Sequence, residues 1–307
     1  MFRKEWGFDS LHGHHSFTVR VMSALQRSTS GTGRNGSWSA KWLGVAIAMA
    51  FVATLAGAPL HAEDVSGCQK QPAQRALNTQ WPINIGMLAE QLIVYRCTDY
   101  MNDVANAVAE ARTWVERRAP EVENAAVVFD IDETSLSNWE AIYHDHFAFF
   151  ANGPCDLSSP NACGWVEWFL SARAVALPPT LAFFRFVKTL HDKSGANIAV
   201  FFITGRHEEP SLRAATELNL RKEGYDEWQG LYLRSVSTLG EFVSKYKTDA
   251  RKEIEKKYTI IANLGDQYSD LIGDPDNDHA DKCFKIPDPF YFIPPALPAE
   301  GLKCLSH

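Results

Sequence analysis

The chain lacks internal repeats and long low-complexity tracts, which excludes a repeat array or an extended disordered tract as its main architecture. Its 307 residues, 46% of them hydrophobic, are enough to bury one sizeable core. We therefore expect a single folded domain over most of the chain.

The chain also has little positive charge. It carries 30 Lys and Arg against 37 Asp and Glu, a net charge of −7. Six of these basic residues and two of the acidic ones precede residue 63, so the remainder has 24 against 35, a net charge of −11. Such an acidic surface repels nucleic acid and other polymeric polyanions, so we expect no nucleic-acid partner.

No CxxC motif or pair of histidines at ligand spacing accompanies the cysteines, which argues against a zinc site. Their even number is typical of an exported protein with disulfides, and all of them follow residue 62: Cys68, Cys97, Cys155, Cys163, Cys283 and Cys304. Fifteen pairings are possible. Proximity in the sequence favours Cys155–Cys163, Cys283–Cys304 and Cys68–Cys97.

Only one long apolar run is present, WLGVAIAMAFVATLAGAPLHA after Lys41. With a plausible cleavage point after Ala62, residues 1–62 are typical of a secretory signal, which predicts a periplasmic or secreted protein without stable membrane insertion after cleavage. An uncleaved anchor and a lipoprotein cleavage site at Cys68 are the alternatives. The polar stretch before the run indicates a long n-region or a true start at Met22.

Five short apolar runs predict strands, and helical patterns fill the gaps between them. The expected strands are 125–130, 198–203, 231–234, 259–262 and 283–286, after a helical region at 85–118 that is broken once. This alternation predicts a mostly parallel sheet covered by helices on both faces. In such a sheet, chemistry is carried out at the carboxyl ends of the strands, where Asp130 and Asp132 stand.

Four motifs in order resemble those of the haloacid-dehalogenase-like (HAD) hydrolases. FDIDET, containing Asp130 and Asp132, resembles motif I, and the following SLSN is similar to the acid phosphatase branch of subfamily IIIB, which includes bacterial secreted phosphatases and plant vegetative-storage-type proteins. ITGR with Thr204 and Gly205 resembles motif II. Lys247 occupies the place of the motif III lysine, and GDQYSD with Asp266 and Asp270 resembles the GDxxxD form of motif IV.

The resemblance implies a three-layer α/β/α Rossmann-like fold over residues 63–307, with a small cap inserted after the first catalytic strand at about 137–179. It implies a Mg²⁺-dependent acid phosphatase that hydrolyses small phosphomonoesters through an aspartyl-phosphate. Asp130 would be the nucleophile and Asp132 the general acid and base. Thr204, Gly205 and Lys247 would bind the phosphoryl group. The Mg²⁺ ligands would be Asp130, Asp266, Asp270 and the backbone carbonyl of Asp132.

Each candidate residue also has a plainer explanation. The strand-end aspartates would cap a helix starting near Thr134, and Lys247 would be a solvated helix residue. Thr204 would be a loop hydroxyl. Asp266 and Asp270, four apart, would share one helix face, where a cation would relieve their repulsion. Arg206 would either touch substrate or pair with Glu208 or Glu209.

The expected cap is rich in aromatic residues, which either pack it onto the core, the favoured interpretation, or stack on an aromatic leaving group: Trp139, Tyr143, Phe147, Phe149, Phe150, Trp165 and Trp168. The acidic run 274–281 lacks the glycine and glutamate of an EF-hand, so we expect a solvated loop. A phosphotransferase and a non-catalytic storage or binding protein are the alternative functions. The sequence leaves the physiological ester and the oligomeric state open.

Overall fold

A computed structural model describes residues 84–238, 241–274 and 277–293. The proposed signal (1–62), Met22, Cys68 and Cys304 lie outside these ranges. Within them, no helix is both long and apolar enough to cross a bilayer.

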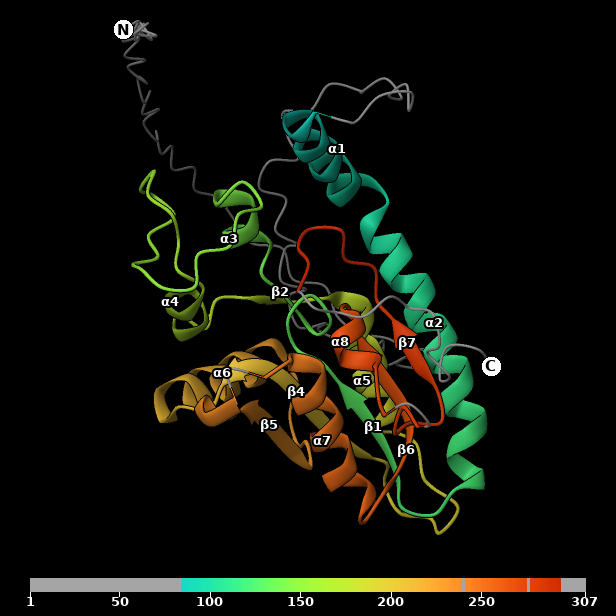
Figure 1. Cartoon of the computed structure of the whole chain (residues 1–307). Coiled ribbons are helices and arrows are strands. Elements are labelled where there is room, and N and C mark those ends of the chain that lie inside the picture. Colours follow the sequence, from blue (N-terminus) through green and yellow to red (C-terminus); the bar gives the residue numbers. More distant parts are fainter. Residues whose placement is uncertain (1–83, 239–240, 275–276, 294–307) are drawn as a thin grey trace, which may run out of the picture. The chain divides into compact units, whose positions relative to one another are not determined.

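The main sheet has five parallel strands in the order β5-β4-β1-β6-β7 (Figure 1). The strands are β1 (Ala125–Phe129), β4 (Ala199–His207), β5 (Gly230–Arg234), β6 (Thr259–Gly265) and β7 (Cys283–Lys285). All five residues of β1 are buried, as expected for a central strand covered on both faces. The predicted mostly parallel α/β fold is therefore confirmed.

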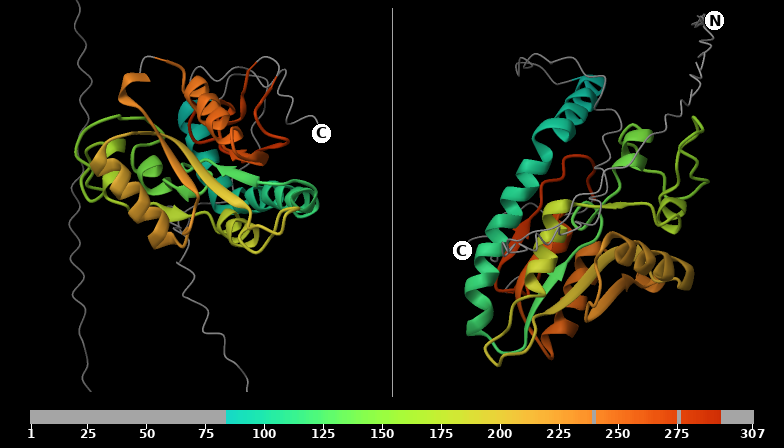
Figure 2. Two further views of the ribbon diagram at one scale, coloured as in Figure 1. Left: turned by 90° about the horizontal axis from the view of Figure 1, so that it is seen from below. Right: turned by 180° about the vertical axis from the view of Figure 1, so that it is seen from behind.

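Helices cover both faces of the sheet. Helix α7 (Val243–Glu255) packs on one face, where Ala250 and Ile254 meet Ala126 and Val128 of β1. Helices α2 (Tyr100–Arg118) and α5 (Pro178–Val187) pack on the other face, against the side chains of Val127 and Phe129. Figure 2 shows α7 on the opposite side of the sheet from α2 and α5. Alternate residues of one strand thus serve two separate cores.

The amino-terminal helical region breaks once, as predicted, between α1 (Ile85–Thr98) and α2. Helix α2 buries an apolar stripe at three- and four-residue spacing, which anchors it to the sheet: Tyr100, Val104, Val108, Ala111 and Val115. The remaining helices of the main layer are α6 (Pro210–Glu223) and the short α8 (Tyr268–Leu271).

Two strands run further than the sequence predicts. We expected β4 to end at Ile203 and β6 at Ala262, but they continue to His207 and Gly265. Pairing with neighbouring strands explains both extensions, because His207 aligns with Arg234 and Gly265 with Lys285. Motif II therefore lies within a strand and not in the loop after it.

The expected cap segment, residues 137–179, contains α3 (Trp139–His144) and α4 (Trp165–Leu170). A two-stranded antiparallel ladder of β2 (Leu136–Ser137) and β3 (Val175–Ala176), which the sequence did not predict, closes its base. The predicted Cys155–Cys163 disulfide is present. Cys97 and Cys283 are also disulfide-bonded, while their proposed partners Cys68 and Cys304 are outside the described part of the chain.

The expectation of a solvated acidic loop at 274–281 is wrong for two of its residues. Asp278 and His279 are buried, because the loop folds against α7. There, Arg251 Nε donates to the Asp278 carbonyl at 3.1 Å, and a ring nitrogen of His279 lies 2.6 Å from a Glu255 carboxylate oxygen.

Candidate active site

Motif I forms a tight turn at the carboxyl edge of the sheet. The backbone N–H of Asp130 donates to the Leu264 carbonyl of β6 at 2.9 Å. The chain then doubles back, so that the N–H groups of Ser135 and Leu136 both donate to the Ile131 carbonyl at 2.8 Å. No helix begins near Thr134. The helix-cap explanation of the aspartates is therefore wrong, and both carboxylates are left for other partners.

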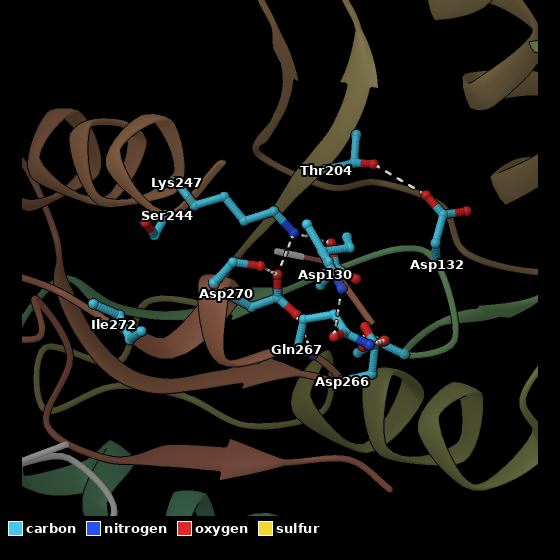
Figure 3. Close-up of polar contacts among 12 residues, drawn as sticks. Asp130, Asp132, Thr204, Ser244, Lys247, Asp266, Gln267, Asp270 and Ile272 are labelled. Carbon is cyan, nitrogen blue, oxygen red and sulfur yellow. Dashed lines mark hydrogen bonds and ion pairs between the residues drawn. The ribbon is translucent and has the colours of Figure 1, made fainter. Parts of the chain in front are cut away.

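Lys247 reaches from α7 into this edge (Figure 3). Its Nζ lies 2.5 Å from Asp130 Oδ1 and 2.6 Å from Asp270 Oδ1. The lysine is only 4% exposed, so the alternative of a solvated helix residue is wrong. Burial alone would lower the pKa of Lys247, but the charges of Asp130 and Asp270 raise it above its usual value, which keeps the ammonium charged.

Asp266 and Asp270 do not share a helix face. Asp266 directly follows β6, whereas Asp270 lies in α8, whose amino-terminal cap is Gln267. The backbone N–H of Gln267 donates to Asp270 Oδ2 at 2.8 Å, and its side-chain Nε2 donates to Asp266 Oδ2 at the same distance. One glutamine thus orients both acidic side chains.

Three carboxylates converge beside Lys247. One oxygen from each of Asp130, Asp266 and Asp270 lies within 4.8 Å of the others, and all three residues are buried. Burial raises the pKa of Asp130 and Asp266 well above the usual range, and the charge of Asp270 raises both further. When ionised, three carboxylates and one ammonium leave two negative charges. An oxygen-only, dianionic group of this kind fits a divalent cation such as Mg²⁺.

The carboxylate of Asp132 stands apart from this cluster and faces Arg206. Arg206 Nη2 lies 2.7 Å from Asp132 Oδ1, and Arg206 Nε also donates to both Asp132 oxygens. Asn138 Nδ2 donates to Oδ1 at 3.0 Å. The guanidinium is buried against the ring of Phe169 in the cap segment, 4.1 Å from its centroid.

Neither expectation for an acidic partner of Arg206 holds. Glu208 instead pairs with Arg213 at 2.5 Å, and the partner that reaches Arg206 is Asp132, from the turn after β1. Nothing in the local sequence signals this pair, since 74 residues separate Arg206 from Asp132.

The motif II residues occupy two different environments. Gly205 borders the cavity described below, whereas Thr204 is fully buried, with its hydroxyl oxygen 3.4 Å from Asp132 Oδ2. The Thr204 hydroxyl also accepts from the backbone N–H of Arg206 at 3.2 Å. Figure 3 shows Thr204 and Asp132 on one side of Asp130, and Lys247 and Asp270 on the other.

A cavity of about 520 Å³ opens onto these residues. Asp130, Asp132, Lys247, Asp266 and Asp270 all line it. The cap segment contributes aromatic walls, and the segment after β7 contributes more: Phe149, Trp165, Phe169, Tyr291 and Phe292. The aromatic residues of the cap segment therefore fall into two groups. Trp139 and Trp168 are buried in the core and do not line the cavity, whereas Phe149 and Trp165 border it.

Comparison with known families supports the family resemblance. The family model described as HAD superfamily, subfamily IIIB (acid phosphatase) matches residues 57–294. The chain belongs to this family.

Relatives of the subfamily IIIB chain include Acid phosphatase 1 of Solanum lycopersicum, 33% identical over 167 residues, which are 54% of this chain and 58% of that protein. A stem 31 kDa glycoprotein of Glycine max is 30% identical, with 55% and 60% covered. Vegetative storage protein 1 of Arabidopsis thaliana is also 30% identical, with 54% and 55% covered. The chain thus matches somewhat over half the length of these relatives.

The class C acid phosphatase from Bacillus anthracis is similar in structure, with a TM-score of 0.50 at 17% identity. The likeness covers 67% of this chain and 84% of that one. At this identity it bears on the fold alone.

Three residues at the site of this subfamily IIIB chain were not predicted from the sequence. Gln267 stands directly after Asp266, and its place between two acidic candidates was the one available signal. His207 and Arg234 line the cavity from the ends of β4 and β5. Their position depends on the pairing of two strands, so no local motif marks them.

Proposed function

We propose that this chain is an exported, Mg²⁺-dependent acid phosphatase that hydrolyses small phosphomonoesters through an aspartyl-phosphate on Asp130. The observation that carries the proposal is the buried cluster of Asp130, Lys247, Asp266 and Asp270, which lines a cavity of about 520 Å³. A structural ion pair with Lys247 would need only one carboxylate. Three buried carboxylates beside one lysine repel each other, which destabilises the fold. Phosphoryl transfer does use such a constellation.

Asp130 attacks the phosphorus of the bound ester. Lys247, already paired with Asp130 at 2.5 Å, offsets negative charge as the anionic substrate approaches. Backbone donors at Thr204 and Gly205, together with the Thr204 hydroxyl, bind the phosphoryl oxygens. Electrostatic stabilisation from donors held in advance is usually the largest single contribution to such a reaction.

Asp132 is the group that donates and accepts protons in the reaction. It protonates the oxygen of the leaving alcohol, and then removes a proton from the water that attacks the aspartyl-phosphate. Its carboxylate is held by Arg206 and Asn138, away from the metal-binding oxygens. This separation supports different roles for two aspartates that are only two residues apart.

Carboxylates of Asp130, Asp266 and Asp270 would hold the Mg²⁺ ion, with the backbone carbonyl of Asp132 as a further ligand. Bound there, the ion would supply positive charge that offsets repulsion between nucleophile and phosphate. Gln267 fixes the orientation of both motif IV carboxylates through its backbone N–H and its side-chain amide.

The cavity favours small esters over polymeric substrates. The net charge of −11 that remains without residues 1–62 repels polyanions, whereas a small monoester reaches the local positive charge of Lys247. Transfer of the phosphoryl group to an alcohol in place of water would use the same residues. Product analysis with added alcohol acceptors separates the two outcomes.

Export is supported by the apolar run before Ala62 and by the Cys155–Cys163 disulfide. Expressed with its full amino-terminal segment, the protein should be recovered outside the cytoplasm without residues 1–62 and without free thiols. Intact-mass analysis before and after alkylation checks this. A full-length mass with six alkylated cysteines would contradict both the signal and the disulfides.

A storage role is the second candidate, because relatives include proteins named vegetative storage proteins. The buried Asp130–Lys247 pair favours catalysis instead, since an ion pair enclosed at a cavity has no role in storage that an apolar pair would not fill.

The deciding experiment measures release of phosphate from p-nitrophenyl phosphate between pH 4 and 7.5, with Mg²⁺ and with chelator. The Asp130→Asn variant should lose at least about a thousandfold in kcat, because the amide is not a nucleophile. Asp226→Asn, on an exposed loop residue, is the matched control and should keep full activity. Equal activity in wild type and Asp130→Asn would refute the nucleophile, and no activity in folded, Mg²⁺-loaded wild type would favour storage.

A further inference from the structure

Arg234 is a buried cation that lines the cavity and has no acidic partner among the described residues. It ends β5 and is only 8% exposed. Its Nη2 donates to the carbonyls of Thr238 and Glu241, at 2.7 and 2.5 Å. Its Nε has no hydrogen-bond partner in the described ranges. Backbone carbonyls satisfy donors but leave the positive charge without a counter-ion.

Two other buried arginines, Arg206 and Arg251, show how the charge or the donors of such a side chain are satisfied elsewhere in the fold. Arg206 is neutralised by Asp132. Arg251 also donates its hydrogen bonds to uncharged oxygen atoms, but it does so from all three nitrogens, Nε, Nη1 and Nη2. It does not border the cavity. Arg234 donates hydrogen bonds from Nη2 alone and lines the cavity. Burial lowers the pKa of Arg234 from its ordinary value, and the charge of Glu241 offsets only part of this effect.

The wall beside Arg234 also carries a histidine. His207 is the Cα partner of Arg234 on β4 and lines the same cavity, and its side chain has no hydrogen bond or ion pair with any described residue. The nearby acidic side chains have other partners. Glu208 pairs with Arg213 at 2.5 Å, and Glu241 pairs with Lys245 at 3.1 Å. The charge of Glu241 also acts on Arg234, but this carboxylate is itself paired with Lys245. Among the described residues, this wall therefore offers nitrogen donors without an unpaired carboxylate to oppose an anion.

The spacing to the reaction centre follows from the sheet. Strand β5 is the second neighbour of β1, and adjacent strands lie about 4.8 Å apart. Phe129 aligns with Leu231 through Phe202, so Arg234 also lies about two residues further along its strand than Asp130. The two backbone positions are therefore on the order of 10 Å apart. Apolar side chains of Leu212 and Val243 also line the cavity. A ligand that spans the cavity from Asp130 to Arg234 would have an anionic group at each end and an uncharged spacer between them.

We propose that Arg234 and His207 form a second anion-binding subsite, which selects phosphomonoesters that carry another anionic group about 10 Å from the reacting phosphate. This inference rests on the proposed phosphatase function, since it assigns a substrate class to the same cavity. Arg234 acts on recognition and not on the chemical step.

The test compares hexyl phosphate with hexane-1,6-diol bisphosphate, whose two phosphates have about this separation. Two equivalent ester groups alone give a twofold advantage. Wild type should prefer the bisphosphate by at least about twentyfold in kcat/KM, and Arg234→Gln should reduce that preference about tenfold. Arg221→Gln removes an equal charge on the exposed side of α6 and should leave both substrates unchanged.

A wild-type preference of twofold or less would overturn the subsite, as would an unaltered preference in a folded Arg234→Gln protein. If that variant fails to fold, His207→Asn takes its place, with a smaller reduction expected. If wild type hydrolyses neither ester, the proposed function fails, and calorimetry with hexane-1,6-bisphosphonate and hexylphosphonate tests the subsite alone. Tighter binding of the bisphosphonate that weakens about tenfold in Arg234→Gln supports the subsite, and equal binding of both ligands overturns it.

Discussion

At the scale of single residues, the two motif I aspartates have the same side chain but different partners. Asp130 is enclosed with Lys247 and two further carboxylates, whereas Asp132 is held by the guanidinium of Arg206. A bidentate arginine pair fixes the plane of a carboxylate as well as its position. Arg206 is therefore a positioning residue for Asp132, and its contact with Phe169 links that carboxylate to the cap segment.

Replacing Arg206 with Gln should affect esters in proportion to how much their leaving group needs a proton. We expect kcat/KM for an alkyl phosphate to fall about a hundredfold, with a much smaller fall for 2,4-dinitrophenyl phosphate, because a nitrophenolate leaves without protonation. Steady-state kinetics on both esters measure the ratio. Arg213→Gln, at a partly exposed ion pair, is the control. An equal loss on both esters would show that Arg206 has only a structural role.

At the scale of elements, the carboxyl edge of the sheet gathers the site, and connections at the opposite edge hold the strands in register. Asp192 follows α5 and accepts hydrogen bonds from the Asn124 N–H at 2.7 Å and from the Ser194 side chain at 2.6 Å. These hydrogen bonds, that from the Ser194 hydroxyl first among them, lower the pKa of Asp192 to about 2. Asp192 thus ties the start of β1 to the loop before β4.

The variant Asp192→Asn should lower the midpoint of thermal unfolding at pH 7. Because the folded-state pKa is below the unfolded value of about 3.9, the stabilisation is present above pH 4 and is lost as pH falls toward 2. The difference between wild type and variant should therefore shrink between pH 4 and pH 3. Calorimetry at pH 7, 4 and 3 checks this, and a difference independent of pH would contradict the assignment.

At the scale of the whole molecule, stability and the proposed catalysis oppose each other at the acidic cluster. Burial raises the pKa of Asp130 and Asp266, so without a cation the folded state is destabilised when these groups ionise. Active sites commonly retain such unfavourable arrangements because function depends on them.

Asp266→Asn should stabilise the metal-free protein by about 1 kcal/mol, because it removes one buried carboxylate while keeping a polar partner for Gln267. It should also abolish the rise in melting temperature that Mg²⁺ gives the wild type. Thermal unfolding with chelator and with a Mg²⁺ titration measures both effects. A variant that is less stable without metal, or that still responds to Mg²⁺, would contradict the proposed ligand role.

The sequence by itself determined the class of fold and the identity of the acidic residues. Buried strands such as β1 are continuous apolar runs in the sequence, and acidic residues directly follow them, so the local pattern located Asp130 and Asp266 correctly at strand ends. The pairing of Cys155 with Cys163 was also within reach, because only eight residues separate them.

The tertiary structure alone decided which side chains meet. Arg206 reaches Asp132 across 74 residues, and Arg234 borders the cavity because β5 pairs with β4. The extensions of β4 and β6 likewise depend on hydrogen bonds to neighbouring strands. The physical reason is the same in each case. A strand's period and an apolar run are local properties of the chain, whereas hydrogen-bond partners, burial and the counter-ions of buried charges come from segments distant in sequence.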